Sequence, residues 1–326
     1  MRKFFRVLGI VVGSLAVLVI IGLIYFNMSF PKAEKVPIVK VEITPERVSR
    51  GGYLVRHVVG CLDCHSERDW TKYAGPIIPG TEGKGGEEFD AEDGVPGVVY
   101  AKNITPAALG SWTDGELIRA ITTGVSKDGT ALFPIMPYGD FNYLRQEDLY
   151  AIVAYLRTLK PVQDTIPERH LVFPMNLIVK TIPFSSYNPG PPINSSDTVA
   201  YGEYLTTIAT CSGCHTQLDK GVPIKGMDYA GGMAFNFPGG VVRSANITPD
   251  DETGIGKWTK EQFVQYFKAF SSDSSHDIHV EPNQYNTVMP LTSFGEMTDQ
   301  DLGAIYAYLR TLTPVHNQVV RFTPKH

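Results

Sequence analysis

The four cysteines of the chain fall in two copies of one pattern, C-x-x-C-H. The first copy is "CLDCH" and the second is "CSGCH"; their cysteines are Cys61, Cys64, Cys211 and Cys214, and their histidines are His65 and His215. Two thiols at this spacing can add to the two vinyl groups of a heme, and the adjacent imidazole then lies below the ring, where it can bind the iron. The pattern predicts two covalently attached hemes with the two histidines as proximal iron ligands.

Other cysteine chemistry fits this spacing less well. A redox dithiol is typical of a strand-to-helix setting and needs no fixed histidine. A zinc site with four cysteines has its two pairs about 15–20 residues apart, whereas Cys64 and Cys211 are separated by 147 positions. A disulfide framework is also disfavoured, because the chain is long and both pairs have the same tight spacing.

A methionine thioether is a common ligand on the other face of a heme and raises its potential. Of the eight methionines, Met136 and Met289 alone occupy matched positions, each followed by proline and preceding a terminal helix. Methionine before a helix is more often core filling, but the matched "MP" favours distal iron ligands. The longer loop before the second methionine carries His276 and His279, either of which could replace it or bind another metal. A polar surface loop is the favoured interpretation.

Matched segments indicate a duplicated unit. "NITP" occurs at Asn103 and again at Asn246, and "DLYAIVAYLRTL" is repeated as "DLGAIYAYLRTL". Both "NITP" copies match the N-glycosylation pattern, but their matched placement favours a structural role. Apolar residues at helical spacing precede each cysteine pair. Thr113 with Glu116, and Thr259 with Gln262, predict capping boxes that begin short helices. The seven prolines between positions 161 and 192 predict a stiff, extended linker.

Residues 7–26 form an uncharged apolar run, about the length needed to cross a bilayer. Arg2, Lys3 and Arg6 precede it, which places the N-terminus in the cytoplasm, and no small-x-small cleavage site follows. We expect an uncleaved single-pass anchor in a bacterial inner membrane, with the soluble domains in the periplasm. The length of 326 residues suggests two domains, and the net charge of −5 gives no indication of a nucleic-acid partner.

The motif order resembles that of the cytochrome c subunits of membrane-bound bacterial alcohol and gluconate dehydrogenases and their diheme relatives. The resemblance covers about residues 50–316. Those subunits typically carry three heme domains and a cleaved signal, unlike this chain. The resemblance implies a mainly α fold, with an N-terminal transmembrane helix followed by two tandem cytochrome c domains. The expected divisions are an anchor (1–28), a spacer (29–49), a first cytochrome c domain (50–160), a proline-rich linker (161–197), a second cytochrome c domain (198–316) and a tail (317–326).

The favoured function is a membrane-anchored diheme electron carrier without catalytic residues of its own. It would transfer electrons from a periplasmic or membrane dehydrogenase or a quinol-oxidising donor to a downstream respiratory acceptor. One alternative is a diheme cytochrome c peroxidase, which needs an open distal side and an acid/base group beside it; the two Met-Pro elements argue against it. The other alternative is the diheme electron-entry subunit of a heme-copper oxidase.

Overall fold

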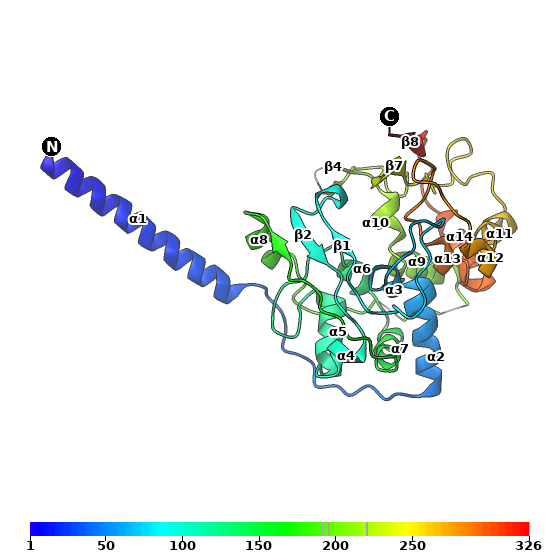
Figure 1. Cartoon of the computed structure of the whole chain (residues 1–326), viewed down its shortest axis with the longest axis horizontal. Coiled ribbons are helices and arrows are strands. Elements are labelled where there is room, and N and C mark those ends of the chain that lie inside the picture. The colour runs from blue at the N-terminus through cyan, green and yellow to red at the C-terminus, as the bar shows by residue number, and fades with distance from the viewer. Residues whose placement is uncertain (191, 195, 220, 326) are drawn as a thin grey trace.

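A long helix projects from a mainly helical body in the computed structural model, which describes residues 1–190, 192–194, 196–219 and 221–325 (Figure 1). Helix α1 (Arg2–Ser29) has no buried residue. Within the described residues it is the one helix long and apolar enough to cross a membrane, and a signal sequence would meet the same criterion. The mainly helical fold and the N-terminal apolar helix agree with the predictions.

The first half of the body contains the first cysteine pair. Its elements are α2 (Pro45–Tyr53), η1 (Leu54–Val58), α3 (Cys61–Cys64), β1 (Glu88–Phe89), η2 (Ala91–Asp93), β2 (Gly97–Tyr100), α4 (Pro106–Leu109), α5 (Asp114–Thr123), α6 (Tyr138–Phe141) and α7 (Gln146–Leu156). Three more elements follow: β3 (His170–Leu171), α8 (Met175–Ile178) and η3 (Val179–Thr181). We call residues 45–156 the first unit.

The second half repeats the helical order of the first. Its elements are α9 (Thr198–Ile208), α10 (Cys211–His215), β4 (Leu218–Asp219), β5 (Val222–Pro223), β6 (Ala234–Phe237), β7 (Gly240–Arg243), α11 (Lys260–Lys268), α12 (Asp273–His276), α13 (Leu291–Phe294), α14 (Asp299–Leu309) and β8 (Phe322–Pro324). We call residues 198–309 the second unit.

The predicted capping boxes are present at the starts of α5 and α11. The Thr113 and Thr259 side chains accept hydrogen bonds from the third backbone N–H of their helices, and Glu116 and Gln262 bond back to the cap. These bonds satisfy donors that a helix start otherwise leaves unpaired. The predicted starts of these two matched helices are therefore confirmed.

Within each unit, the helix before the cysteines crosses the terminal helix at very short range. A Cβ atom on Gly51 of α2 would lie 1.9 Å from the backbone oxygen of Ala151 in α7. A Cβ atom on Gly202 of α9 would lie 1.9 Å from the backbone oxygen of Ala304 in α14. Both crossings require glycine, because any side chain would push the helices apart.

The proline-rich segment is not the extended linker that the sequence predicts. Strand β3 pairs antiparallel with β2 of the first unit, with Val98 opposite His170. Leu171 and Val179 are buried with Val95 in a small apolar cluster beneath this sheet. The prolines separate short apolar stretches, and burying those stretches holds the segment against the first unit.

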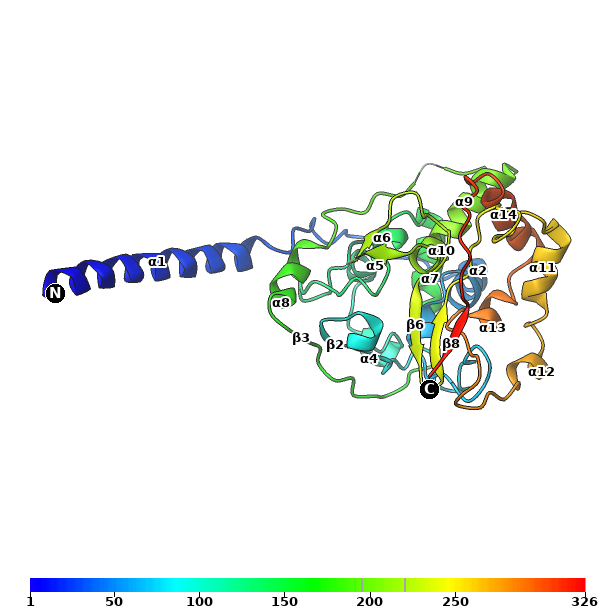
Figure 2. The same cartoon turned by 90° about the horizontal axis from the view of Figure 1, so that it is seen from above.

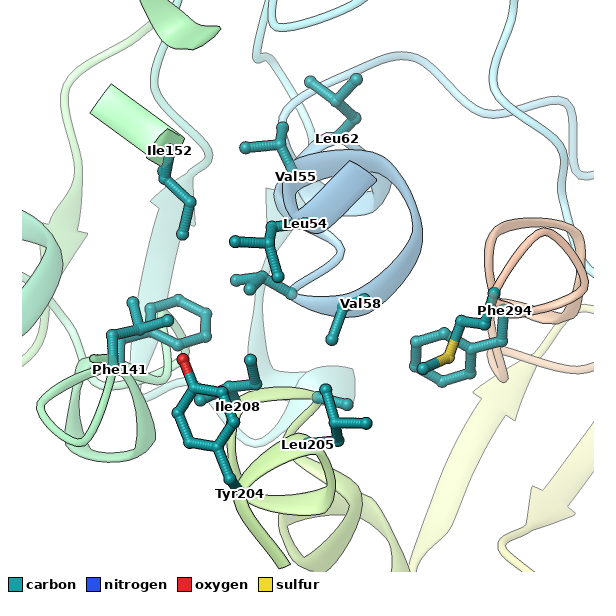
Figure 3. Packing of buried hydrophobic residues seen from close by; sticks show 14 of the residues in the cluster. Leu54, Val55, Val58, Leu62, Phe141, Ile152, Tyr204, Leu205, Ile208 and Phe294 are labelled. Carbon is teal, nitrogen blue, oxygen red and sulfur yellow. The ribbon is translucent and has the colours of Figure 1, made fainter. Parts of the chain in front are cut away.

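The two units share one apolar core. Figure 3 shows η1, with Leu54 and Val58, facing Leu205 and Ile208 of α9. Phe294 of α13 lies beside the same cluster. Because these elements come from both units, the segments that carry the two cysteine pairs are held against each other.

Candidate heme sites

Each cysteine pair follows a residue with left-handed backbone. This residue is Gly60, with φ 67°, before α3 and Thr210, with φ 55°, before α10. The left-handed residue ends the preceding helix and starts a new turn in another direction. Threonine adopts this conformation at a cost of roughly 1–2 kcal/mol. The second unit therefore forms the same turn as the first, although its residue at this position is less suited to it.

The cysteines face a single cavity of about 2840 Å³. All four thiols are free, and Cys64 and Cys214 are exposed because they border this space. The cavity also reaches the two histidines of the C-x-x-C-H motifs and the two matched methionines. Sites for drug-sized ligands measure about 300–1,000 Å³, so the space suits two large flat groups rather than one. The residues present therefore fit covalently held heme at both motifs.

The thiols carry no charge at neutral pH. Although two of them border the cavity, the surrounding protein shields all four thiols from bulk water. This desolvation raises the pKa of Cys61, Cys64 and Cys211 to about 12 and also raises that of Cys214. In Cys64, the neighbouring Asp63 and the Cys214 thiol add to the effect of burial. A reactive redox dithiol needs a thiol with a lowered pKa. The raised values disfavour that chemistry and are compatible with thioether attachment.

Both histidines are held in one tautomer by backbone carbonyls. His65 Nδ1 lies 2.6 Å from the oxygen of Lys102, and His215 Nδ1 lies 2.7 Å from the oxygen of Ala245. A carbonyl only accepts, so Nδ1–H is the donor and Nε2 keeps its lone pair for a metal. Burial lowers the pKa of His65 and lowers that of His215 to about 4, so both rings are neutral.

The "NITP" motif supports these carbonyls and was not assigned this role from sequence. Asn103 directly follows Lys102, and its side-chain oxygen accepts from the N–H and hydroxyl of Thr105, both at 2.8 Å. Its amide donates to the oxygen of Val162 at 2.7 Å, just after the terminal helix. The second unit repeats this network with Asn246, Thr248 and Val315. Both asparagines are buried, which confirms the structural interpretation and disfavours glycosylation.

The matched methionines lie at equivalent turns bordering the cavity. Each precedes a proline with nearly the same backbone, φ −80° and ψ 53° at Pro137 and φ −78° and ψ 64° at Pro290. These prolines begin α6 and α13. Met233 and Met297 also border the cavity, and Met297 is fully buried. The sequence argument did not single out these two, because neither has a counterpart in the first unit.

The loop with His276 and His279 connects the two units. The Tyr73 N–H donates to the oxygen of Ile278 at 2.8 Å, and the Ala74 N–H donates to the Asn286 side chain at 2.9 Å. His276 Nε2 lies 3.0 Å from the oxygen of Phe270, whereas His279 is exposed beside Glu281. In the described part of the chain, no group of three or more His, Cys, Asp and Glu side chains could hold a metal ion. The loop is polar and largely on the surface, as predicted, but its hydrogen bonds also connect the second unit to the first.

Each methionine-bearing turn packs against the other unit. Helix α13, which follows Met289, packs on η1, and α6, which follows Met136, packs on α9. Ser293 of α13 donates its hydroxyl to Asp63, inside the first C-x-x-C-H motif, at 2.7 Å. Its backbone oxygen lies 3.2 Å from Nδ1 of His57, which is on η1. The two sites are therefore adjacent at the junction of the units, on the one cavity that they share.

Comparison with known proteins finds similarity to c-type cytochromes. Residues 199–313 match the family model for cytochrome c. The matched residues span nearly the whole of the second unit. The first unit repeats its helical order, its C-x-x-C-H motif and its Met-Pro turn. Heme c is thus the cofactor that the family implies.

Longer similarities cover both units. The chain is 30% identical over 284 residues to the cytochrome c subunit of a quinone alcohol dehydrogenase from Gluconacetobacter polyoxogenes, covering 82% of this chain and 56% of that subunit. It is 26% identical to the cytochrome c subunit of gluconate 2-dehydrogenase from Pantoea cypripedii, covering 81% and 59%. It is 27% identical to a diheme cytochrome c-type protein of Cereibacter sphaeroides, covering 78% and 83%.

The resemblance predicted from the motif order is confirmed by these relatives. The chain spans a little over half the length of the dehydrogenase cytochrome c subunits that it matches, and most of the length of the diheme protein. The prediction of an electron-transfer protein rather than an enzyme agrees with these relatives, each of which is named as a cytochrome.

Proposed function

We propose that the protein is a membrane-anchored diheme cytochrome c, built from two tandem cytochrome c domains, that carries electrons between a dehydrogenase or quinol-oxidising donor and a respiratory acceptor. One observation carries the proposal. Two C-x-x-C-H motifs, each with its histidine fixed by a backbone carbonyl, share one cavity with two equivalent Met-Pro turns. This repetition is expected for two redox centres of the same kind.

The proposed attachment and ligand set follows the repeat. Cys61 and Cys64 would hold the first heme, and Cys211 and Cys214 the second. When bound, heme c supplies an iron that takes up and gives back one electron. The iron ligands would be His65 and Met136 in the first site and His215 and Met289 in the second. With both faces ligated, neither site keeps an open position for a substrate.

The polypeptide would limit how much the surroundings of each site rearrange when its charge changes by one electron. The thiols are neutral, the imidazoles are neutral and fixed in one tautomer, and residues of the shared apolar core form part of the cavity wall. A fixed, poorly hydrated environment needs little rearrangement when one electron is gained or lost. The position of both sites on one cavity supports electron exchange between them.

Helix α1 is the proposed membrane anchor. Its 28 residues extend about 42 Å at 1.5 Å per residue, which exceeds the roughly 30 Å hydrocarbon core of a bilayer. The positive residues before the apolar run favour a cytoplasmic N-terminus. The body would then lie in the periplasm, where c-type heme is attached. An anchored carrier stays at the membrane surface, close to membrane-bound donors and acceptors.

The test is to follow the full-length protein in bacterial membranes that carry out c-type heme attachment. After alkaline carbonate washing, the heme-stained band should remain in the membrane pellet with residues 1–29 still attached. Affinity purification from detergent should retain subunits of a dehydrogenase or of a quinol-oxidising complex. A heme-stained protein in the soluble fraction, cut after α1, would contradict the anchor. Purification with the subunits of a heme-copper oxidase would assign the chain to the alternative electron-entry role.

A further inference from the structure

We propose that the surface around α8 rests on the lipid bilayer and forms a second membrane contact beside α1. We define this lipid-facing surface by the exposed apolar side chains Val172, Phe173, Ile178 and Phe184. The proposal rests on the proposed function in one respect, since it takes α1 as the anchor that brings this surface to the membrane.

The lipid-facing surface is apolar and is firmly held. Val172 is 47% exposed, Phe173 77%, and Ile178 and Phe184 44% each. Exposed apolar residues are ordinary one at a time, but a cluster of large ones marks a binding surface. The opposite side of the same segment is buried in the cluster beneath the β1–β2–β3 sheet, through Leu171 and Val179. Because that side is packed, the segment cannot turn its outward residues into the body.

The charges of this segment suit phospholipid headgroups. The sequence has no Asp or Glu between Glu168 and Asp197. Of the two basic residues there, Arg169 donates inward to the oxygen of Ala131, so Lys180 is the cation available to headgroups. Long cationic side chains can keep their heads in the polar layer while apolar neighbours enter the lipid. A positive charge beside apolar side chains is the pattern of proteins that lie on a membrane surface.

The lipid-facing surface is continuous with the proposed anchor. The Lys180 ammonium donates to the Asn27 side chain, which directly follows the apolar run of α1. The Glu34 N–H donates to the backbone oxygen of Ser185 at 2.7 Å, so the chain leaving α1 contacts the end of the same segment. In both views α8 is the labelled helix of the body closest to the end of α1 (Figures 1 and 2).

This continuity favours lipid over a protein partner. If α1 spans the bilayer, Asn27 lies where the hydrocarbon ends, and its partner Lys180 lies at the level of the headgroups. Two contacts would also fix how the body is oriented on the membrane, which a single helix would not.

The proposal is tested on the full-length, heme-loaded protein in nanodiscs of mixed zwitterionic and anionic phospholipid. A phospholipid with a photoactivatable diazirine in its acyl chain is included, and adducts are mapped by mass spectrometry. We expect adducts in α1 and in residues 172–184, and none at Val320, which is 65% exposed on the C-terminal tail. Adducts in α1 alone would overturn the inference and leave the anchor intact. Adducts in residues 172–184 without α1 would support the surface and contradict the anchor.

A variant pair makes the test specific to the lipid-facing surface. Phe173→Asp combined with Ile178→Asp should reduce adducts in residues 172–184 at least tenfold, with labelling of α1 unchanged. Val320→Asp is the matched control and should change neither. The heme absorption spectrum of each variant reports whether the body is folded. Undiminished labelling of the double variant would overturn the inference, and so would a protein partner that blocks labelling of residues 172–184 in native membranes.

Discussion

At the scale of single residues, the two proposed heme sites differ from an ordinary pair of thiols in one respect: the histidine beside each pair is fixed by a hydrogen bond. His65 and His215 each give Nδ1–H to a carbonyl, and those carbonyls are positioned by buried asparagines. An imidazole fixed in this way presents Nε2 to a metal without rotating. The roles of Met136 and Met289 stay a prediction that substitution can test.

Replacing either methionine should remove a sulfur ligand from one heme only. The oxidised protein should show the weak long-wavelength absorption band of His/Met ligation, and Met136→Ala should lower that band by about half. Met289→Ala should do the same, and the double variant should abolish the band. Met227→Ala is the control, because Met227 does not border the cavity. A full band in Met289→Ala would instead favour Met233, Met297, His276 or His279 as the distal ligand of the second heme.

The carboxyl of Asp140 should make stability depend on pH. Burial raises the pKa of this carboxyl from 3.8 to about 6. Its negative charge in turn adds to the raised pKa of the Cys211 thiol. Between pH 4 and 6 the folded protein therefore binds more protons than the unfolded chain, so this group lowers stability as pH rises through that range. Asp140→Asn should be more stable than the wild type at pH 7.5 by roughly 1–2 kcal/mol, discounting for the partial exposure of the carboxyl.

Chemical denaturation of both proteins at pH 7.5 and pH 4.5 measures this difference. The advantage of Asp140→Asn should shrink towards pH 4.5, since both side chains are then largely neutral. An advantage that is equal at the two pH values would show that charge is not its cause.

At the scale of elements, each unit depends on a helix crossing that leaves no room for a side chain. The same crossing occurs between α2 and α7 and between α9 and α14, with glycine at both contact points. The crossing sets where the helix before the cysteines ends, and hence where the thiols meet the cavity.

Gly51→Ala and Gly202→Ala should each destabilise the protein, because the new methyl group would overlap a backbone oxygen. The expected loss of unfolding free energy is roughly 1–3 kcal/mol for overpacking of this kind. Gly190→Ala is the matched control, since its nearest neighbour would lie 3.8 Å away. Urea denaturation of the three variants checks this, and equal stability of all three would contradict the crossing argument.

Much of this could be predicted at the level of elements. The capping boxes gave two helix starts, and the repeated motifs gave the matched helices and the candidate ligands. The carbonyls that orient the histidines could not be predicted, because any residue supplies the same backbone oxygen. The folding of the proline-rich segment was also missed, since proline count says nothing about whether the apolar residues between prolines find a partner. The domain boundaries stay a prediction.

At the scale of the whole molecule, the two units join through a reciprocal pair of hydrogen bonds. Tyr53 of α2 donates to Asp301 of α14, and Tyr204 of α9 donates to Asp148 of α7, both at 2.6 Å. In one bond the first unit supplies the tyrosine and the second unit the aspartate, and in the other bond the assignment is reversed. A two-fold relation between the units requires such a pair. They hold the two units together around the shared core, so that both cysteine pairs face the same cavity.

The two bonds should nevertheless differ in strength. Asp148 also accepts from Arg50 at 2.8 Å and from Arg145 at 3.2 Å. In the described part of the chain, the Asp301 carboxylate has Tyr53 as its one hydrogen-bond partner. Tyr53→Phe should therefore cost about 1.5–3 kcal/mol of unfolding free energy, and Tyr204→Phe about 1 kcal/mol. Thermal denaturation compares them, and the reverse order would show that the interface is not organised by these carboxylates.

The most direct test of the central claim is a peptide map of the purified, denatured protein. Covalent attachment at both motifs predicts that the peptide with Cys61 and Cys64 and the peptide with Cys211 and Cys214 each carry the mass of one heme. The heme stain should follow the protein band on a denaturing gel, and acid acetone should extract none of the heme. Finding either cysteine pair as free thiols or as a disulfide in protein from a host with c-type heme attachment would contradict the account.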